Sequence, residues 1–145
     1  MLHVVTGPPA AGKSSWIKAH AKADDIVIDL DLMALAMAGP GADHHAHGEV
    51  LMRVVHRARF AALNEAYQHL DKVDVYVIHT QPSAKTLAKY KRLDARIVTV
   101  DPGRDIVMGR IKAMRQPGME RVATRWYNAR RGQPRGAMPQ ASRAW

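Results

Sequence analysis

Residues 7–14 read Gly7-Pro8-Pro9-Ala10-Ala11-Gly12-Lys13-Ser14 and match the pattern G-x-x-x-x-G-K-[ST] of phosphate-binding loops. An apolar run at 2–6 precedes this loop, and a run compatible with a helix follows it from Ser14 to Lys22. In the order strand, loop and helix, the backbone N–H groups and the positive end of the helix dipole face the same anion. We therefore predict that the chain binds a nucleoside triphosphate.

Two side chains of the loop have specific tasks in this prediction. Lys13 stands where it can reach the β- and γ-phosphates, and the Ser14 hydroxyl stands where it can ligate Mg²⁺. The glycines permit the tight turn that brings the backbone close to the phosphates. The alternative is a Gly/Pro turn with a surface lysine. The predicted nucleotide-binding residues of this segment are Gly7, Pro8, Pro9, Ala10, Ala11, Gly12, Lys13, Ser14 and Ser15.

Strand-like and helical runs alternate along the chain. The strand-like runs lie at 2–6, 26–29, 73–79 and 96–100, and the helical patterns lie at about 13–22, 31–38, 49–71, 83–92, 104–115 and 118–131. Short β-branched strands with helical crossovers predict an α/β fold of three α/β/α layers, with a short parallel sheet of four to five strands. Ligands then bind at the carboxyl ends of the strands. The residues at those ends are 7–14, 29–31, 79–81 and Asp101.

Composition limits the classes of protein that fit the chain. With 145 residues, of which 47% are hydrophobic and 24% are charged, we expect one globular domain. No apolar run approaches the roughly 18–20 residues that span a bilayer, so we expect no membrane partner. Cysteine is absent, which excludes disulfides and thiolate zinc sites. These features lead us to expect a cytoplasmic protein.

Two carboxylates directly follow the second predicted strand, in Asp29-Leu30-Asp31. A carboxylate there faces the loop across a short sheet, so it can accept a proton from a phosphoryl acceptor or help to hold Mg²⁺. The alternative is that Asp31 caps the next helix and that Asp29 is a solvated strand end. We predict catalytic roles for Lys13, Asp29 and Asp31, metal binding by Ser14 and Asp29, and substrate binding by Asp29.

The third predicted strand ends in His79-Thr80-Gln81, without the acidic residue that often ends such a strand in nucleotide-binding proteins. The second metal contact, beside Ser14, is therefore either Asp29 or a water molecule bridged to Thr80. Thr80 is accordingly predicted to bind the substrate.

Positive charge is concentrated in the last third of the chain. Residues 1–103 hold 12 Lys+Arg and 11 Asp+Glu, whereas residues 104–145 hold 10 and 2. Two helical patterns joined at Arg115-Gln116-Pro117-Gly118 carry arginines throughout, which predicts a lid at about 104–121 that closes over a triphosphate. Arg110 and Arg115 are the predicted phosphate contacts, and Arg115, at the hinge, is also assigned to catalysis. Residues 132–145 show no periodicity and are expected to form an extended tail.

Two helical patterns have faces of different character. In 49–71 the pattern puts Val50, Val54, Ala58, Ala61 and Leu63 near one face, and another face carries Arg53, His56 and Arg57. In 118–131 the expected core stripe comprises Met119, Val122, Ala123, Trp126 and Tyr127, opposite Arg121, Arg125 and Asn128. Arg53 and Arg57 are candidates for binding the acceptor.

Taken together, the loop at 7–14, Asp29 with Asp31, the Asp101-Pro102 turn and the predicted lid resemble the small P-loop kinases related to bacteriophage polynucleotide 5′-kinase. The resemblance covers about residues 1–131, as one kinase domain. It implies ATP with Mg²⁺ as the phosphoryl donor, Asp29 or Asp31 as the general base, and the lid residues Arg110 and Arg115 on the phosphates. It also implies the host cytoplasm as the location if a phage encodes the chain.

The chain departs from this family at one position. The family holds its acceptor with an arginine shortly after the acidic motif, whereas Leu32-Met33-Ala34-Leu35 follow Asp31 here. Arg53 or Arg57 is the expected substitute.

We expect an enzyme, an ATP-dependent phosphotransferase that moves the γ-phosphoryl group to a hydroxyl of a nucleic acid or nucleoside. The arginine-rich last third favours a polyanionic acceptor, such as a polynucleotide 5′-hydroxyl or a hydroxymethylated base in DNA. One alternative is a kinase of a small metabolite or free nucleoside. The other is a P-loop ATPase that acts as a switch, with water as its phosphoryl acceptor.

Overall fold

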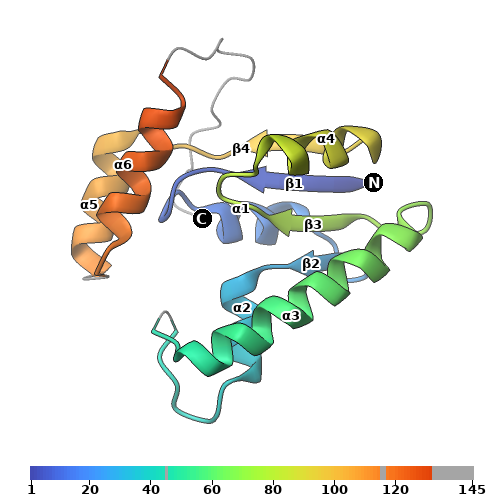
Figure 1. Ribbon diagram of the computed structural model, residues 1–145, viewed down its shortest axis with the longest axis horizontal. Helices are drawn as coiled ribbons and strands as arrows, with labels where there is room; N and C mark the ends of the chain where they lie inside the picture. Colours follow the sequence, from blue (N-terminus) through green and yellow to red (C-terminus); the bar gives the residue numbers. More distant parts are fainter. Residues whose placement is uncertain (45, 115–116, 132–145) are drawn as a thin grey trace.

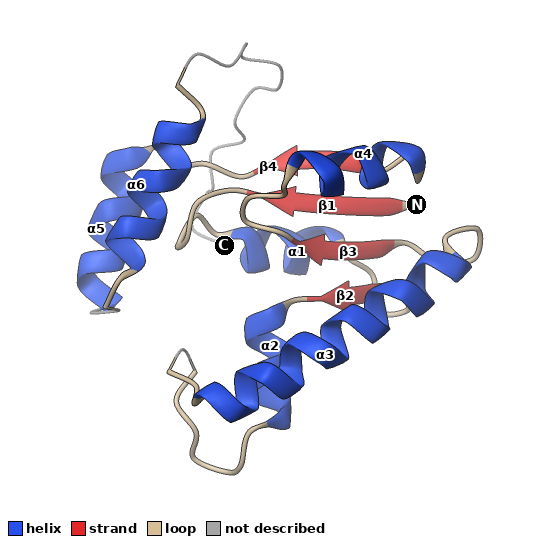
Figure 2. Ribbon diagram, in the orientation of Figure 1, coloured by secondary structure: helices blue, strands red, loops and turns tan. Residues whose placement is uncertain are grey.

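The computed structural model describes residues 1–44, 46–114 and 117–131. Within these residues the chain forms four strands, six α-helices and one short 3-10 helix (Figures 1 and 2). In chain order they are β1 (Leu2–Thr6), α1 (Lys13–His20), β2 (Ile26–Ile28), α2 (Leu30–Met37), α3 (Glu49–Ala66), η1 (Tyr67–His69), β3 (Val75–Ile78), α4 (Ala84–Arg92), β4 (Arg96–Thr99), α5 (Arg104–Met114) and α6 (Met119–Ala129).

All four strands belong to one parallel sheet, with the order β2-β3-β1-β4. The central strand β1 pairs with β3 on one side, where Val4 lies opposite Val77, and with β4 on the other, where Val5 lies opposite Val98. The predicted parallel α/β sheet is thus confirmed, with four strands in the described residues. The carboxyl ends of the strands lie at one edge, and the loop before α1, the start of α2 and the α5–α6 pair lie beyond it (Figure 1).

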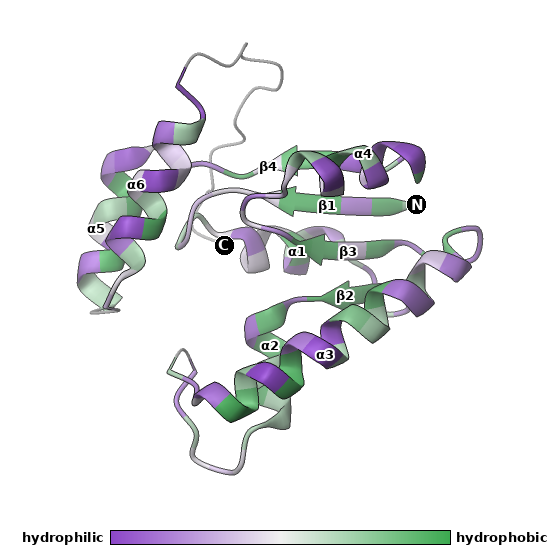
Figure 3. Ribbon diagram, viewed as in Figure 1, coloured by the Kyte–Doolittle hydropathy of each residue, from purple (hydrophilic) through white to green (hydrophobic). Residues whose placement is uncertain are grey.

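Helices cover both faces of the sheet, because successive strand side chains point to opposite faces. Leu2 and Val4 of β1 belong to a cluster with α3 and α4, whereas Val5 belongs to a second cluster with α1 and α5. Figure 3 shows that the sheet is largely apolar while the helices combine hydrophilic and hydrophobic residues. The arrangement is compatible with the expected α/β/α layers. None of the helices in the described residues has the length and apolar character needed to cross a bilayer.

Two element boundaries differ from the sequence prediction by several residues. The helix expected at 49–71 ends at Ala66, and η1 follows it as a separate 3-10 turn. The strand expected from Val73 begins at Val75. The Met1 amino group donates to the carbonyl oxygen of Val73 at 3.4 Å and to the Asp74 carboxylate at 2.9 Å.

The apolar face expected for α3 is buried only in part. Leu63 is buried, but Val50 and Val54 are 77% and 47% exposed. Val55 and Ala66, which lay outside the expected face, are also buried. The buried face has helical spacing but also includes the half-buried Arg59. The hydropathy pattern favours the face with Val50 and Val54, which no charged residue interrupts. Packing against the sheet instead uses the face that contains Arg59.

The core stripe expected for α6 was correct. Ala123 and Trp126 are buried, and Met119 and Tyr127 pack partly buried against the same cluster. Arg121, Arg125 and Asn128 are exposed, as predicted for the opposite face. Two further contacts join α6 to the carboxyl edge of the sheet. Trp126 Nε1 donates to the Thr80 carbonyl at 3.0 Å, and the Tyr127 hydroxyl donates to Asp101 at 2.7 Å.

Replacing Gly7 with alanine is expected to destabilise the fold by about 2–3 kcal/mol. Gly7 has a φ of +146°, and a Cβ added there would lie 2.1 Å from the Val100 carbonyl oxygen. The matched control is Gly109→Ala in α5, where an added Cβ meets nothing within 4 Å. Because alanine favours a helix over glycine, this control is expected to gain up to about 1 kcal/mol. Urea denaturation measures both changes, and equal stabilities of the two variants would contradict the prediction.

Candidate active site

The segment between β1 and α1 turns sharply at its two glycines. Gly7 and Gly12 have φ values of +146° and +97°, a region that glycine adopts without strain, and Ala10 has a φ of +59°. The Ala11 amide donates to the Pro8 carbonyl at 3.3 Å, which closes the turn. Helix α1 begins at Lys13, so the first turn of this helix opens directly onto the loop.

Lys13 is a buried cation inside this loop. Its ammonium Nζ donates to the carbonyl oxygens of Gly7 at 3.0 Å and Pro8 at 2.6 Å. Burial lowers the pKa of Lys13 to about 8, against the opposing effect of the negative charges of Asp29 and Asp31. No carboxylate among the described residues forms an ion pair with Lys13. An anion that enters the loop would provide the missing negative charge.

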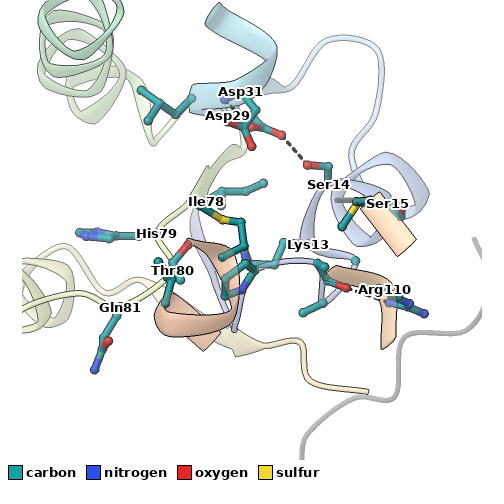
Figure 4. A pocket seen from close by; sticks show the side chains of 18 of the residues that line it. Lys13, Ser14, Ser15, Asp29, Asp31, Ile78, His79, Thr80, Gln81 and Arg110 are labelled. Carbon is teal, nitrogen blue, oxygen red and sulfur yellow. Dashed lines mark hydrogen bonds between the residues drawn. The ribbon is translucent and has the colours of Figure 1, made fainter. Parts of the chain in front are cut away.

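Asp29 links the end of β2 to the loop. Its Oδ2 accepts a 2.6 Å hydrogen bond from Ser14 Oγ, and its Oδ1 accepts a 3.1 Å bond from the Asp31 amide (Figure 4). The carboxylate therefore caps α2 and is only 3% exposed. The alternative reading named Asp31 as the cap and Asp29 as a solvated strand end, and both parts of it were wrong. The bend at the end of the strand buries the first carboxylate and leaves the second exposed.

A cleft of about 880 Å³ lies at the carboxyl edge of the sheet, within the size range of small-molecule sites. The loop residues Pro9 to Ser15 form its floor, and α2, α3, α5, α6 and the end of β3 form its walls. Asp29, Asp31, Thr80 and Arg110, all predicted site residues, line this cleft. Gly7 and Pro8 are not among the lining residues, although their carbonyls hold Lys13.

The lid predicted at about 104–121 covers α5 and the start of α6, two helices that pack against each other and against the sheet. Val107, Ile111 and Ala123 are buried in the same cluster as Val5. Arg110 lines the cleft, and its guanidinium donates to the Ala10 carbonyl at 3.1 Å. The structure thus brings Arg110 to the loop. Arg115, the other predicted lid residue, lies outside the described residues, as does the predicted tail at 132–145.

The end of β3 supplies neutral polar groups to the cleft. The Thr80 carbonyl accepts bonds from the Gly7 amide at 3.4 Å and from Trp126 at 3.0 Å, while the Thr80 side chain lines the cleft. His79 Nδ1 lies 2.8 Å from the Tyr90 hydroxyl. Burial, with a smaller effect from the charge of Arg59, lowers the pKa of His79 below its ordinary value.

The arginines of α3 are arranged differently from the sequence expectation. Arg53 and Arg57 are exposed and do not line the cleft, and Arg53 instead pairs with Glu49 on the same helix at 2.9 Å. The residues of α3 that line the cleft are His56 and Arg59. Sequence reasoning missed Arg59. The signal that could have found it is its helical spacing from Val55 and Leu63, which belong to the buried face.

The residues around Ser14 fit a hard divalent cation in part. Hydroxyl and carboxylate oxygens suit Mg²⁺, which usually binds to one or two protein groups, several waters and the substrate phosphates. Ser14 and Asp29 supply two such groups, 2.6 Å apart, at the edge of the cleft. In the part of the chain that the structure describes, no group of three His, Cys, Asp or Glu side chains could hold a metal alone. The phosphates of a nucleotide would therefore have to complete the coordination.

In comparisons with protein families and with curated proteins, nothing matches this chain. The chemistry of the cleft is therefore what supports a function.

Proposed function

We propose that the protein is an ATP-dependent phosphotransferase that moves the γ-phosphoryl group of ATP to a hydroxyl of a nucleic acid or nucleoside. One observation carries most of this proposal. A single cleft is lined by Lys13, by the hydrogen-bonded pair Ser14 and Asp29, and by the exposed carboxylate of Asp31. A phosphate-binding loop alone would support nucleotide binding. A free carboxylate beside it supports transfer to an alcohol.

The loop is the proposed site of the triphosphate. Its turn with positive φ angles and the start of α1 provide backbone N–H groups for phosphate oxygens. Lys13 exchanges its carbonyl partners for phosphate, and Arg110, held at the Ala10 carbonyl, adds a guanidinium from the lid. These cations would stabilise negative charge on the transferring group. Bound Mg²⁺, held by Ser14 and Asp29 with the phosphates, would neutralise further phosphate charge.

The two aspartates support a division of roles. Both carboxylate oxygens of Asp29 accept a hydrogen bond, one from Ser14 and one from the Asp31 amide. This carboxylate is thus committed to the loop and to the cap of α2. Asp31 is exposed in the cleft, and no donor among the described residues is hydrogen-bonded to its carboxylate. We therefore assign proton transfer to Asp31 and the binding of Mg²⁺, together with Ser14, to Asp29.

In the proposed reaction, the Asp31 carboxylate takes the proton of the acceptor hydroxyl. The hydroxyl oxygen forms a bond to the γ-phosphorus, and the bond from this phosphorus to the β,γ-bridging oxygen breaks. ADP leaves with the electron pair of that bond. Catalysis consists mainly of positioning and charge stabilisation, as in other phosphoryl transfers.

Acceptor-dependent release of ADP tests the proposal. The full chain is incubated with MgATP and with a single-stranded oligodeoxynucleotide, with a panel of nucleosides, or without acceptor. ADP release that requires one of the acceptors supports a kinase. Release at the same rate in every mixture would favour the alternative, a switch ATPase that uses water. For a kinase, a KM for DNA that rises steeply with salt favours the nucleic-acid acceptor over a free nucleoside.

Binding of MgATP is expected to take up about half a proton at pH 8. The pKa of Lys13 in the free protein is about 8, so half of the molecules carry a neutral amine at that pH. The negative charge of bound phosphate raises this pKa and protonates the amine. At pH 6.5 Lys13 is charged with or without ATP, so its contribution disappears. Calorimetry in buffers of different ionisation enthalpy measures the uptake, and equal values at the two pH values would contradict the prediction.

A further inference from the structure

We propose that Trp126 and Tyr127 of α6 position the phosphate-binding loop, because they join the two strand ends between which the loop begins. Both are positioning residues, since neither side chain lines the cleft. The inference rests on the proposed function for the identity of the bound nucleotide. It adds to that function two residues that are distant from the loop in sequence.

Gly7 begins the loop in a narrow slot between two carbonyl groups. Strand β1, which leads into the loop, lies between β3 and β4 in the sheet. On the β3 side, the Gly7 amide donates to the Thr80 carbonyl at 3.4 Å. On the β4 side, a Cβ on Gly7 would lie 2.1 Å from the Val100 carbonyl oxygen. The segments that follow β3 and β4 therefore set the position of Gly7.

Helix α6 contacts both of these segments through two consecutive side chains. The indole Nε1–H of Trp126 donates to the same Thr80 carbonyl at 3.0 Å. The hydroxyl of Tyr127 donates at 2.7 Å to the carboxylate of Asp101, which directly follows Val100. Trp126 and Tyr127, here called the α6 clamp, thus connect the ends of β3 and β4 across the strand that carries the loop.

The two rings of the α6 clamp are themselves held in place. Trp126 is only 3% exposed, and its ring meets that of Tyr127 edge-on, with 5.0 Å between the centroids. The guanidinium of Arg130 lies 4.6 Å from the centroid of the Trp126 ring, and that of Arg104 lies 5.9 Å from the Tyr127 ring. Burial, with the hydrogen bond to Asp101, raises the pKa of Tyr127, so its hydroxyl stays protonated and remains the donor.

The α6 clamp reaches the phosphate-binding groups of the loop through Gly7. The Gly7 carbonyl accepts a 3.0 Å hydrogen bond from Lys13 Nζ. A shift of Gly7 therefore moves an oxygen that holds the Lys13 ammonium, and it also moves the backbone N–H groups of the turn. A displacement of about 1 Å that arises far from the reacting atoms can lower the rate of an enzyme about 100-fold. The path of contacts from Trp126 thus ends at Lys13.

Trp126→Phe tests the inference, because phenylalanine keeps a ring but cannot donate to the Thr80 carbonyl. In the full chain we expect calorimetry to show about three- to tenfold weaker binding of magnesium tripolyphosphate and of MgATP, the effect of one lost hydrogen bond. NMR titration is expected to place the pKa of Lys13 above its original value of about 8, since a loosened loop admits water to an amine whose burial keeps that pKa low. Tyr127→Phe is expected to change both quantities in the same direction.

Tyr76→Phe is the matched control. The Tyr76 hydroxyl donates to the His20 carbonyl at 3.4 Å, and its ring is buried in the cluster that includes Ala123 of α6. This control is expected to leave the affinity for MgATP and the pKa of Lys13 unchanged, whatever its stability in urea. The inference is overturned if a folded Trp126→Phe keeps either quantity at its original value, or if Tyr76→Phe changes them equally.

The same data separate this inference from the proposed function, because tripolyphosphate has no nucleoside and the titration of Lys13 needs no ligand. Weaker binding and a raised pKa in Trp126→Phe, without transfer from ATP by the unaltered chain, contradict the proposed function alone. Transfer by the unaltered chain, with Trp126→Phe binding and titrating as that chain does, contradicts the inference alone.

A measurement on the unaltered chain covers the case in which Trp126→Phe does not fold. If the α6 clamp strengthens the binding of phosphates, bound phosphates must stabilise the clamp by the same factor. Saturating magnesium tripolyphosphate is therefore expected to slow hydrogen exchange at the Trp126 indole N–H about three- to tenfold more than at Trp16, a second buried tryptophan. Equal or smaller slowing at Trp126 would overturn the inference.

Discussion

Replacing Lys13 with methionine is expected to weaken ATP binding by about 10- to 100-fold and to lower kcat by roughly 10²–10³-fold. The first effect reflects the loss of charge-assisted hydrogen bonds to phosphate. The second reflects the loss of a buried cation that would stabilise the charge of the transferring group. Methionine keeps the length of the side chain and has no charge to bury, so the loop is expected to remain folded.

Calorimetry with MgATP and steady-state kinetics measure these effects. The matched control is Lys18→Met, since Lys18 is an exposed lysine on the same helix and outside the cleft. This control is expected to bind ATP as the unaltered chain does. If both variants bind ATP equally well, Lys13 is a structural lysine that only closes the turn through its carbonyl bonds.

Replacing Asp31 with asparagine is expected to lower kcat by roughly 10²–10⁴-fold, with the affinity for ATP within a few-fold of the original. This range is the usual contribution of a positioned general base. Asparagine keeps the shape of the side chain but cannot take the acceptor proton. Initial rates at saturating ATP and acceptor, together with calorimetry, separate the two quantities.

Asp29→Asn is the comparison that tests the assignment of the two carboxylates. Asparagine caps helices well, so α2 is expected to keep its start. With the amide oxygen kept at the cap, an NH₂ group that cannot bind a cation stands beside Ser14. We therefore expect the Mg²⁺ concentration for half-maximal activity to rise about tenfold or more. The assignment of proton transfer to Asp31 is contradicted if Asp31→Asn retains full kcat while Asp29→Asn loses it at saturating Mg²⁺.

Local sequence signals predicted the parallel sheet and the core stripe of α6. Strands such as Leu2–Thr6 and Val75–Ile78 are short, rich in β-branched residues and buried, so their strand pattern is clear. Helix α6 places Ala123 and Trp126 on one face and its arginines on another. In these elements composition and packing largely agree, because the buried positions are apolar except for His3 and Thr6 in β1.

Helix α3 shows where such signals fail. Its buried face includes Arg59, whose guanidinium donates to the Ile78 carbonyl and lines the cleft. Only the folded chain brings these groups together. The face with the exposed Val50 and Val54 therefore has a stronger hydropathy pattern than the buried face, which contains an arginine. In the same way, Asp29-Leu30-Asp31 predicted two acidic residues near the loop but not which of them is buried. That difference depends on the Ser14 hydroxyl, which is distant in sequence.

Transfer of the radiolabelled γ-phosphoryl group of ATP is the most direct test of the proposed chemistry. The full chain and its Asp31→Asn variant are incubated with labelled ATP, Mg²⁺ and single-stranded DNA or nucleosides, and the products are separated. The proposal predicts label in a phosphate ester of the acceptor, formed by the unaltered chain and nearly absent with the variant. Label found solely in orthophosphate, at a rate that no acceptor changes, would contradict it.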